Sequence, residues 1–381
     1  MKLTTENFGE VILLTSPILV GATESIAFKT DVFESKNGNE TRIPLKDKAR
    51  QTLSFSSLDL REEIVKNFNV QWGGIRKNWA VPLAQESQYV GDVYGDFINC
   101  RTDIYSFYDG CLALLKNKSK STLIEVLEVS EEGLLISGEE DIKDAKLYPV
   151  RVCFINGDII RKVNNKYTNS SITFVVIDEP EVQESIPQQF LGHDAHQFCL
   201  MLDSGKLETA IIQNQNIINN EVGVIYQNSD WDHARYSKQY RTLINGHNEL
   251  YEYRQFLFRC RGKYRQFWLP TYEVNMRVKS IGQISNVIQI EADQYKQLGD
   301  SRKHIAIKCD GIWFMHTISE SSFISASTVQ ITISPSLNKS ASSIQRISYL
   351  GLHRLDADSV DLNYIGSGKV EVSVPILEIG V

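Results

Sequence analysis

Two short stretches of the chain group side chains that could do chemistry. In the first, Asp230 and Asp232 flank Trp231, and His233 follows. Glycoside hydrolysis uses two carboxyl groups about 5 to 9 Å apart, and residues two apart on a strand face the same way at roughly that distance. The pair could therefore act on a sugar. Paired acids are also common on solvated surfaces, and we expect that plainer role here.

The second stretch contains His193 and His196, three residues apart, with Asp194 between them. A metal site would need this pair on a helix together with a third ligand. The surrounding residues 178–196 include prolines and show little periodicity, which favours a linker with exposed polar side chains. We therefore predict no metal site and no cofactor.

Motifs of the common enzyme classes are missing from the sequence. There is no GxSxG, no HExxH, no Walker loop and no GxGxxG that opens a helix. Serine, histidine and aspartate occur without local order, which gives no indication of a catalytic triad. We predict a protein that is not an enzyme and has no catalytic residues.

Aromatic residues alternate with arginines along residues 248–272. Both types are enriched at protein interfaces, because they bury a large area and keep a polar tip. A core helix packed on a core strand would account for part of the aromatic residues. Since the whole chain is acidic, we expect the arginines to meet an acidic partner surface or to form ion pairs within an oligomer. These arginines are Arg254, Arg259, Arg261 and Arg265.

One helix and one strand would position these side chains. Apolar residues recur every three or four positions from Leu250 to Cys260, which places them on one helix face. Gly262 ends that pattern, as a left-handed cap would. A basic, aromatic strand is predicted at 263–268, with Pro270 stopping it.

The same order of features occurs earlier in the chain. A helix is predicted at 59–69 with Asp59 as its N-cap, and a Gly-Gly pair and a tryptophan follow. Arg76 and Trp79 have the same spacing as Arg265 and Trp268, so we interpret the chain as a duplication. The residues that we expect to organise the cores or contacts of the two copies are Arg76, Trp79, Arg259, Arg265 and Trp268.

Most other segments are short β-branched or aromatic runs between turn residues, which predicts a mainly β fold. We expect two related β-sandwich or β-barrel-like domains, each with a short inserted helix, and added C-terminal strands. The predicted parts are copy one at 1–180, a linker at 181–197, copy two at 198–336 and strands completing a sheet at 337–381.

Composition narrows the functional classes. The 381 residues are 42% hydrophobic and 23% charged, with a net charge of −7 and a pI near 5.6. Nucleic-acid binding usually needs a basic face, so we expect none. No apolar run approaches the roughly 20 residues that span a bilayer, and we expect neither a membrane anchor nor a signal peptide. The scattered cysteines predict free thiols in a reducing cytosol; they are Cys100, Cys111, Cys153, Cys199, Cys260 and Cys309.

Four stretches together carry a resemblance to a known family. Residues 26–42 (IAFKTDVFESKNGNETR), with Ala49-Arg50-Gln51 after them, are similar to an opening "TDV…G.E.R…PRQ", in which Ala49 replaces the usual proline. Residues 259–271 (RCRGKYRQFWLPT), 346–362 (RISYLGLHRLDADSVDL) and 370–378 (VEVSVPILE) are similar to "RGR…FWLPT", "VSFL…RLDSD.VEL" and "A.VSLPVVE". In this order, the chain resembles the tail-tip structural proteins of tailed bacteriophages.

The resemblance implies a virion protein at the distal end of a phage tail, of the distal-tail or baseplate-hub kind, assembled in the host cytoplasm. Such proteins form rings continuous with the tail tube, and their partners are the tube protein, the baseplate hub and the tail fibre or receptor-binding proteins. A trimer of a duplicated chain would present six similar units to a sixfold tube; a hexamer is the competing arrangement. The resemblance implies no catalytic residue.

Two other functional classes stay open from the sequence. A carbohydrate-binding β-sandwich module that recognises the host surface would stack an exposed Trp231 or Trp313 on a sugar ring. A tail-tip enzyme that cuts cell wall or polysaccharide would depend on Asp230, Asp232 and His233.

Overall fold

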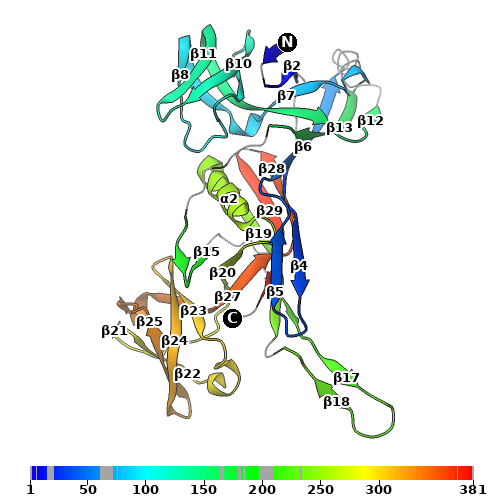
Figure 1. Ribbon diagram of the computed structural model, residues 1–381. Coiled ribbons are helices and arrows are strands. Elements are labelled where there is room, and N and C mark those ends of the chain that lie inside the picture. The colour runs from blue at the N-terminus through cyan, green and yellow to red at the C-terminus, as the bar shows by residue number, and fades with distance from the viewer. Residues whose placement is uncertain are drawn as a thin grey trace.

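The computed structural model describes residues 2–5, 7–14, 21–60, 72–74, 76–163, 167–178, 182, 186–196, 209–231, 234–366 and 368–379. This part of the chain is mainly β, which confirms the predicted fold class, and its strands form large mixed sheets in which no barrel closes. Figure 1 shows an elongated molecule with N-terminal strands at one end, α2 (Gly246–Cys260) in the middle and a second β lobe at the other end. No helix within these ranges is long and apolar enough to cross a membrane.

Two groups of strands, unit one and unit two, follow the same path. Across the sheet, unit one has the order β2-β7-β11-β13-β6-β3 and unit two has the order β15-β20-β27-β29-β19-β16. In both, the first pair is parallel and the others are antiparallel. β12 adds to β13 as β28 adds to β29. The chain is therefore built from two copies of one unit.

The elements of the two units have these bounds. Unit one comprises β2 (Gly9–Leu13), β3 (Ala22–Ala27), β4 (Thr30–Glu34), β5 (Glu40–Pro44), β6 (Arg50–Leu60), β7 (Asn78–Pro82), the end of β11 (Gly133–Ile155), β12 (Ile160–Val163) and β13 (Tyr167–Val176). Unit two comprises β15 (His193–Ala195), β16 (Ala210–Ile212), β17 (Asn216–Ile218), β18 (Tyr226–Asn228), β19 (Arg235–Asn245), α2, β20 (Gln266–Pro270), the end of β27 (Ile344–Leu355), β28 (Ser359–Gly366) and β29 (Lys369–Glu378).

The correspondence between the units holds residue by residue. The β4–β5 hairpin pairs Val32 with Arg42, and the β17–β18 hairpin pairs Ile217 with Gln227. Both hairpins lie between equivalent strands. Each residue of the first hairpin has its equivalent 185 positions later in the second, a difference that we call the shift (217 − 32 = 185). Later in the units the shift changes from strand to strand. β7 pairs Pro82 with Val150 and β20 pairs Pro270 with Leu350, so the shift is 188 from β7 to β20 (270 − 82 = 188) and 200 from the end of β11 to β27 (350 − 150 = 200).

The predicted match of Trp79 with Trp268 is wrong by one residue. With β7 and β20 aligned by their pairing, Trp79 corresponds to Phe267, and Trp268 corresponds to Ala80. Trp79 and Phe267 lie in the main cores of their units, whereas Trp268 faces the opposite side of its strand. A shift of one residue reverses the face of a strand, so matching the two tryptophans in sequence hid the true register.

Each unit carries an inserted lobe after the proline that ends its central strand. Lobe one lies between β7 and the end of β11, and lobe two lies between β20 and the end of β27. Each lobe has its own apolar core, and the long strand that closes it continues into the unit. Lobe one contains β8 (Gln88–Asn99), β9 (Leu112–Lys116) and β10 (Ser121–Val129); lobe two contains β21 (Gln283–Ile284), β22 (Val287–Glu291), β23 (His304–Cys309), β24 (Ile312–Ser325), β25 (Thr328–Ser334) and β26 (Lys339–Ser340). β1 (Lys2–Thr5) pairs with β2, and β14 (Gln189–Phe190) pairs with β15.

This arrangement differs from the predicted division into consecutive parts. The segment interpreted as a linker, 181–197, includes β15, which pairs with β20 inside unit two. β3 and the β4–β5 hairpin, expected within a self-contained first domain, pack on unit two. The final strands β28 and β29 pair with β3 and β19. A unit assembled from distant segments leaves no composition change at its borders, so the sequence could not show it.

The helical predictions had mixed outcomes. α2 ends at Cys260 and buries the predicted face, and Arg261 and Gly262 take the left-handed conformation that terminates it. The strand after it begins at Gln266 and includes Pro270, later than predicted. Asp59 is not a helix N-cap, because it lies in β6 and pairs with β13. Residues 61–69 of that predicted helix lie outside the described ranges.

Candidate assembly surface

The two units are joined inside the chain by β3. One edge of β3 pairs with β6 of unit one, and its other edge pairs with β28 of unit two, where Ile26 lies opposite Val360. The backbone N–H of Phe28 donates to the carbonyl of Asp358 at 2.8 Å, and the Thr30 N–H donates to the Asp358 carboxylate at 3.0 Å. A continuous sheet therefore runs from unit one into unit two.

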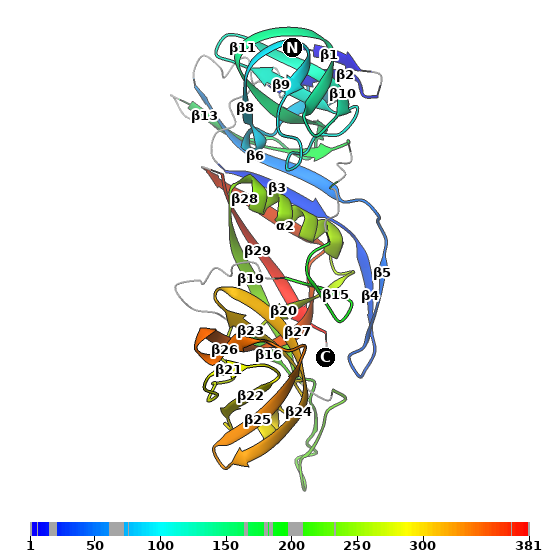
Figure 2. The same cartoon turned by 90° about the vertical axis from the view of Figure 1, so that its left-hand side faces the viewer.

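The β4–β5 hairpin extends this junction along the side of unit two, as Figure 2 shows. Glu40 accepts two hydrogen bonds from the Arg354 guanidinium, both at 2.8 Å, in a buried bidentate pair. At the hairpin tip, Arg235 of unit two donates to Glu34 at 3.0 Å and to the Gly38 carbonyl. The hairpin thus acts as an arm of unit one that holds unit two.

A buried ion network ties lobe one to unit two. Arg254 on α2 contacts Glu24 of β3 and Glu86 beside lobe one, each at 2.5 Å, and it also donates to the Tyr364 hydroxyl at 3.0 Å. Burial disfavours the ionised form of Glu86, but Arg254 and Arg151 outweigh that effect and hold the pKa of Glu86 below its usual range. A buried charged network of this kind fixes the relative position of the parts that it joins, because separating them would leave a buried charge unpaired, which is strongly destabilising.

The network continues on the unit-one side. Arg151 donates to the Ser106 carbonyl at 3.1 Å and lies 3.9 Å from the Asp178 carboxylate. Asp178 accepts from the Tyr108 hydroxyl at 2.7 Å and from the Val152 N–H at 2.9 Å. Burial raises the pKa of Asp178 even though Arg151 and these donors favour its charged form.

The residues singled out from the sequence fall into different environments. Trp79 and Trp268 are buried, and their indole N–H groups donate to the carbonyls of Gly74 at 3.0 Å and Phe190 at 2.7 Å. Arg76 is exposed. Arg259 forms a bidentate pair with Asp194 at 2.6 and 2.8 Å. It shares an open hollow of about 450 Å³ beside the hairpin with Arg265.

The expectation that the arginines of residues 248–272 meet a partner is therefore wrong for at least two of them. Arg254 and Arg259 form their ion pairs within the chain. The sequence shows the overall acidic charge but not that individual acidic residues, such as Glu24 and Asp194, come from segments that fold against α2. The net charge of the chain therefore could not identify the partners of Arg254 and Arg259.

The histidine pair lies in surroundings that differ from the exposed linker expected for it. His193 lies 2.9 Å from the Gln266 amide, and Asp194 is paired with Arg259. His196 is buried rather than exposed, and burial lowers its pKa to about 3. Within the described residues no group of three or more possible ligands could hold a metal. Asp232 and His233, which were considered for catalysis, lie outside the described residues.

No family model matches this chain. A search of curated proteins also finds no match. The candidate surface consequently stands on geometry and on the sequence resemblance alone.

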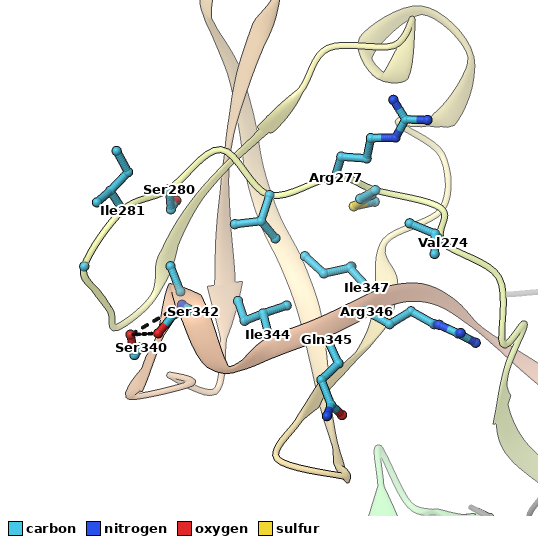
Figure 3. Close-up of a pocket in the computed structure, with 14 residues that line it drawn as sticks. Val274, Arg277, Ser280, Ile281, Ser340, Ser342, Ile344, Gln345, Arg346 and Ile347 are labelled. Atoms are coloured by element: carbon cyan, nitrogen blue, oxygen red, sulfur yellow. Dashed lines mark hydrogen bonds between the residues drawn. The ribbon is translucent and has the colours of Figure 1, made fainter.

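A hollow of about 590 Å³ lies on lobe two. Figure 3 shows aliphatic side chains around it, with Arg277 and Arg346 at one side and Ser340 and Ser342 at the other. The two serine hydroxyls lie 2.8 Å apart and hydrogen bond to each other. Its described lining includes no acid, thiol or imidazole, so general acid–base chemistry has no donor there.

One signal in the sequence was missed. Asp47-Lys-Ala-Arg50 and Asp232-His-Ala-Arg235 are separated by the same 185 positions as the two hairpins (235 − 50 = 185). The stretch considered for catalysis is thus the second copy of the segment that follows the hairpin. This equivalence favours a structural role for Asp232 and His233.

Proposed function

We propose that this protein is a structural component of a phage tail tip, in which copies of the chain form a ring between the tail tube and the tip or receptor-binding proteins. The observation that carries the proposal is the joining of two like units by β3 and its hairpin. Different faces of the two units meet at this junction. A heterologous contact of this type generates a ring when its rotation closes.

A trimer is the arrangement that we favour. Three chains of two units each would present six similar units, which would match a sixfold tail tube. A hexamer of whole chains is the competing arrangement. In either ring the tube would lie on one face and the hub, fibre or receptor-binding proteins on the other, and the protein would reside in the virion after assembly in the host cytoplasm.

The chemistry of the described residues supports an assembly role. The cysteines Cys100, Cys111, Cys153, Cys260 and Cys309 are buried free thiols, as suits a protein folded in a reducing compartment. The Arg254 network gives the rigid relation between units that a ring subunit needs.

The carbohydrate-binding alternative receives less support. Trp313 is buried and packs edge-on against Tyr272. The Arg235 guanidinium lies 4.1 Å from the ring centre of Trp231, so one face of that indole is covered. Sugar stacking needs an open aromatic face. Trp313 is buried and Trp231 is covered on one face, so both are less open than the sequence led us to expect.

Labelling of phage particles tests the proposal directly. An antibody raised against the purified chain is expected to decorate the distal end of the tail in negatively stained particles of the phage that encodes it. Particles lacking the gene product should have no intact tip. Absence of the chain from purified particles by mass spectrometry would exclude the proposed function.

A further inference from the structure

The internal junction has two halves, and each half has an equivalent surface in the other unit. Both equivalent surfaces are uncovered in the single chain. In unit one, β3 and the β4–β5 hairpin are the donor surface, and in unit two, β28 and its surroundings are the acceptor. The equivalent donor in unit two is β16 with the β17–β18 hairpin, and the equivalent acceptor in unit one is β12 with its surroundings. Within the described residues β16 pairs only with β19, and β12 pairs only with β13.

The side chains at these two free edges have complementary exposure. At the internal junction Ile26 and Val360 lie opposite each other and are 3% and 4% exposed. The equivalent of Ile26 is Ile211 on β16, which is 59% exposed in the single chain. Strand pairing relates Val360 to Ile159, the residue before β12, which is partly exposed and is followed by the 61% exposed Ile160. Apolar residues left open at the two positions that are paired and buried elsewhere in the molecule indicate that the same contact forms again.

A hollow lies where the second hairpin would bind. It measures about 720 Å³ and is lined by Arg50, Phe154 and Asn156, among others. The equivalent residues in unit two are Arg235, Arg354 and Asp356. There the first two hold the β4–β5 hairpin. Unit one thus has the receiving site of unit two without the hairpin that fills it.

The contact pair at the centre of this site changes from charged to apolar. Glu40 and Arg354 form the buried ion pair of the internal junction. Their equivalents are Ile225, which precedes β18, and Phe154 on β11, and these are 59% and 40% exposed. A charge on only one side would be a mismatch, but both positions change together, which preserves complementarity.

We propose that β16 and the β17–β18 hairpin of one chain bind β12 and the hollow beside Arg50 of a second copy, repeating between chains the junction that β3 and its hairpin make within one. This inference rests on the proposed ring and names its contacts. Ile211 lies opposite Ile159 of the next copy, and Ile225 packs on Phe154.

The shape and exposure of the β17–β18 hairpin favour its binding to a second copy of the chain. Figures 1 and 2 show β17 and β18 projecting from the body of the molecule, away from the main sheets. A two-stranded hairpin alone in water is marginally stable. Many of its apolar side chains are exposed in the single chain, including Ile217, Val222, Val224 and Tyr226.

An exchange of residues between the two junctions tests the pairing. Ile225→Glu alone and Phe154→Arg alone should each weaken self-association about tenfold or more, because each buries an unpaired charge. The double variant should recover most of this loss, because it reproduces the Glu40–Arg354 pair. Association is read by native mass spectrometry over a concentration series. Both positions are exposed, so an unchanged melting temperature serves as the folding control.

Cysteine cross-linking tests the strand contact independently. With Ile211→Cys and Ile159→Cys in one chain, mild oxidation should give a covalent closed oligomer, since opposed strand residues lie within disulfide reach. Either single variant should give no link, because a head-to-tail contact does not place a residue against its own copy.

The outcomes separate this inference from the proposed function. A ring that forms without cross-links or charge rescue overturns the interface and leaves the ring standing. A chain that stays monomeric under all conditions overturns both. Cross-linking by a single variant would indicate a twofold contact and would also overturn the interface.

Discussion

Arg50 and Arg235 occupy equivalent positions in the two units, yet Arg50 is exposed and Arg235 is 5% exposed beneath the tip of the β4–β5 hairpin. The difference arises because unit one supplies a hairpin to unit two, while the hairpin of unit two has no unit to cover in a single chain. At this position the two units therefore differ in exposure because only unit two is covered by a hairpin in the single chain.

This pair makes a matched prediction. Arg235→Ala should lower the free energy of unfolding by about 1 to 3 kcal/mol, because it leaves the Gly38 carbonyl without its buried donor. Arg50→Ala should leave unfolding within about 0.5 kcal/mol of the wild type and weaken self-association instead. Urea unfolding and native mass spectrometry measure the two effects. Equal effects of both variants on unfolding would contradict the assignment.

Trp268 is expected to contribute strongly to folding, although it does not correspond to Trp79. It is buried between unit two and lobe two and donates to the Phe190 carbonyl. Trp268→Ala should cost about 3 to 5 kcal/mol by urea unfolding. Arg76→Ala is the control and should have little effect, since Arg76 is exposed. A Trp268→Ala protein that melts like the wild type would remove this residue from the packing scheme.

Arg254 is expected to be indispensable while its carboxylate partners stay charged. Arg254→Met should cost about 3 to 5 kcal/mol, because Glu24 and Glu86 would remain buried without a cation. The triple variant Arg254→Met, Glu24→Gln, Glu86→Gln should regain much of that loss. Thermal unfolding compares the two, and a triple variant less stable than the single one would refute uncompensated charge as the cause.

Two buried histidines predict a loss of stability in mild acid. Burial lowers the pKa of His196 and of His353 to about 3, whereas an unfolded histidine titrates near 6.5. Their contribution is complete above pH of about 6.5 and declines as the pH falls toward 3, because only the unfolded chain then binds the protons. Each should account for about 2 kcal/mol between pH 6.5 and 5.

Urea unfolding at pH 7 and pH 5 measures this effect. His353→Gln, which cannot take up a proton in this range, should reduce the difference between the two pH values by about 2 kcal/mol. An unchanged difference in that variant would show that His353 titrates alike in the folded and unfolded chain.

The sequence predicted those features that depend on local pattern. The apolar face of α2 and its left-handed end follow from residue spacing, and β27, β28 and β29 lie in the segment 337–381 that was predicted to complete a sheet. Asn37 and Gly38, a pair typical of hairpin turns, lie between the paired strands β4 and β5. In each case neighbouring residues specify the structure.

The features missed by the sequence depend on distant segments. Arg254 gives no sign that its partners are Glu24, 230 positions away, and Glu86, 168 positions away. The predicted register of the duplication was wrong by one residue, because it aligned the two tryptophans with each other. Strand pairing relates Trp79 to Phe267 instead. The repeat shift itself varies between hairpin and sheet, so no single spacing could show it.

The mass of the purified protein in solution, measured by native mass spectrometry with imaging of any rings, tests the central claim most directly. We predict a closed species of three chains with a central opening, whose formation is lost in the Ile225→Glu variant. A species of two chains related by twofold symmetry, or a monomer at every concentration, would contradict ring formation through the repeated junction.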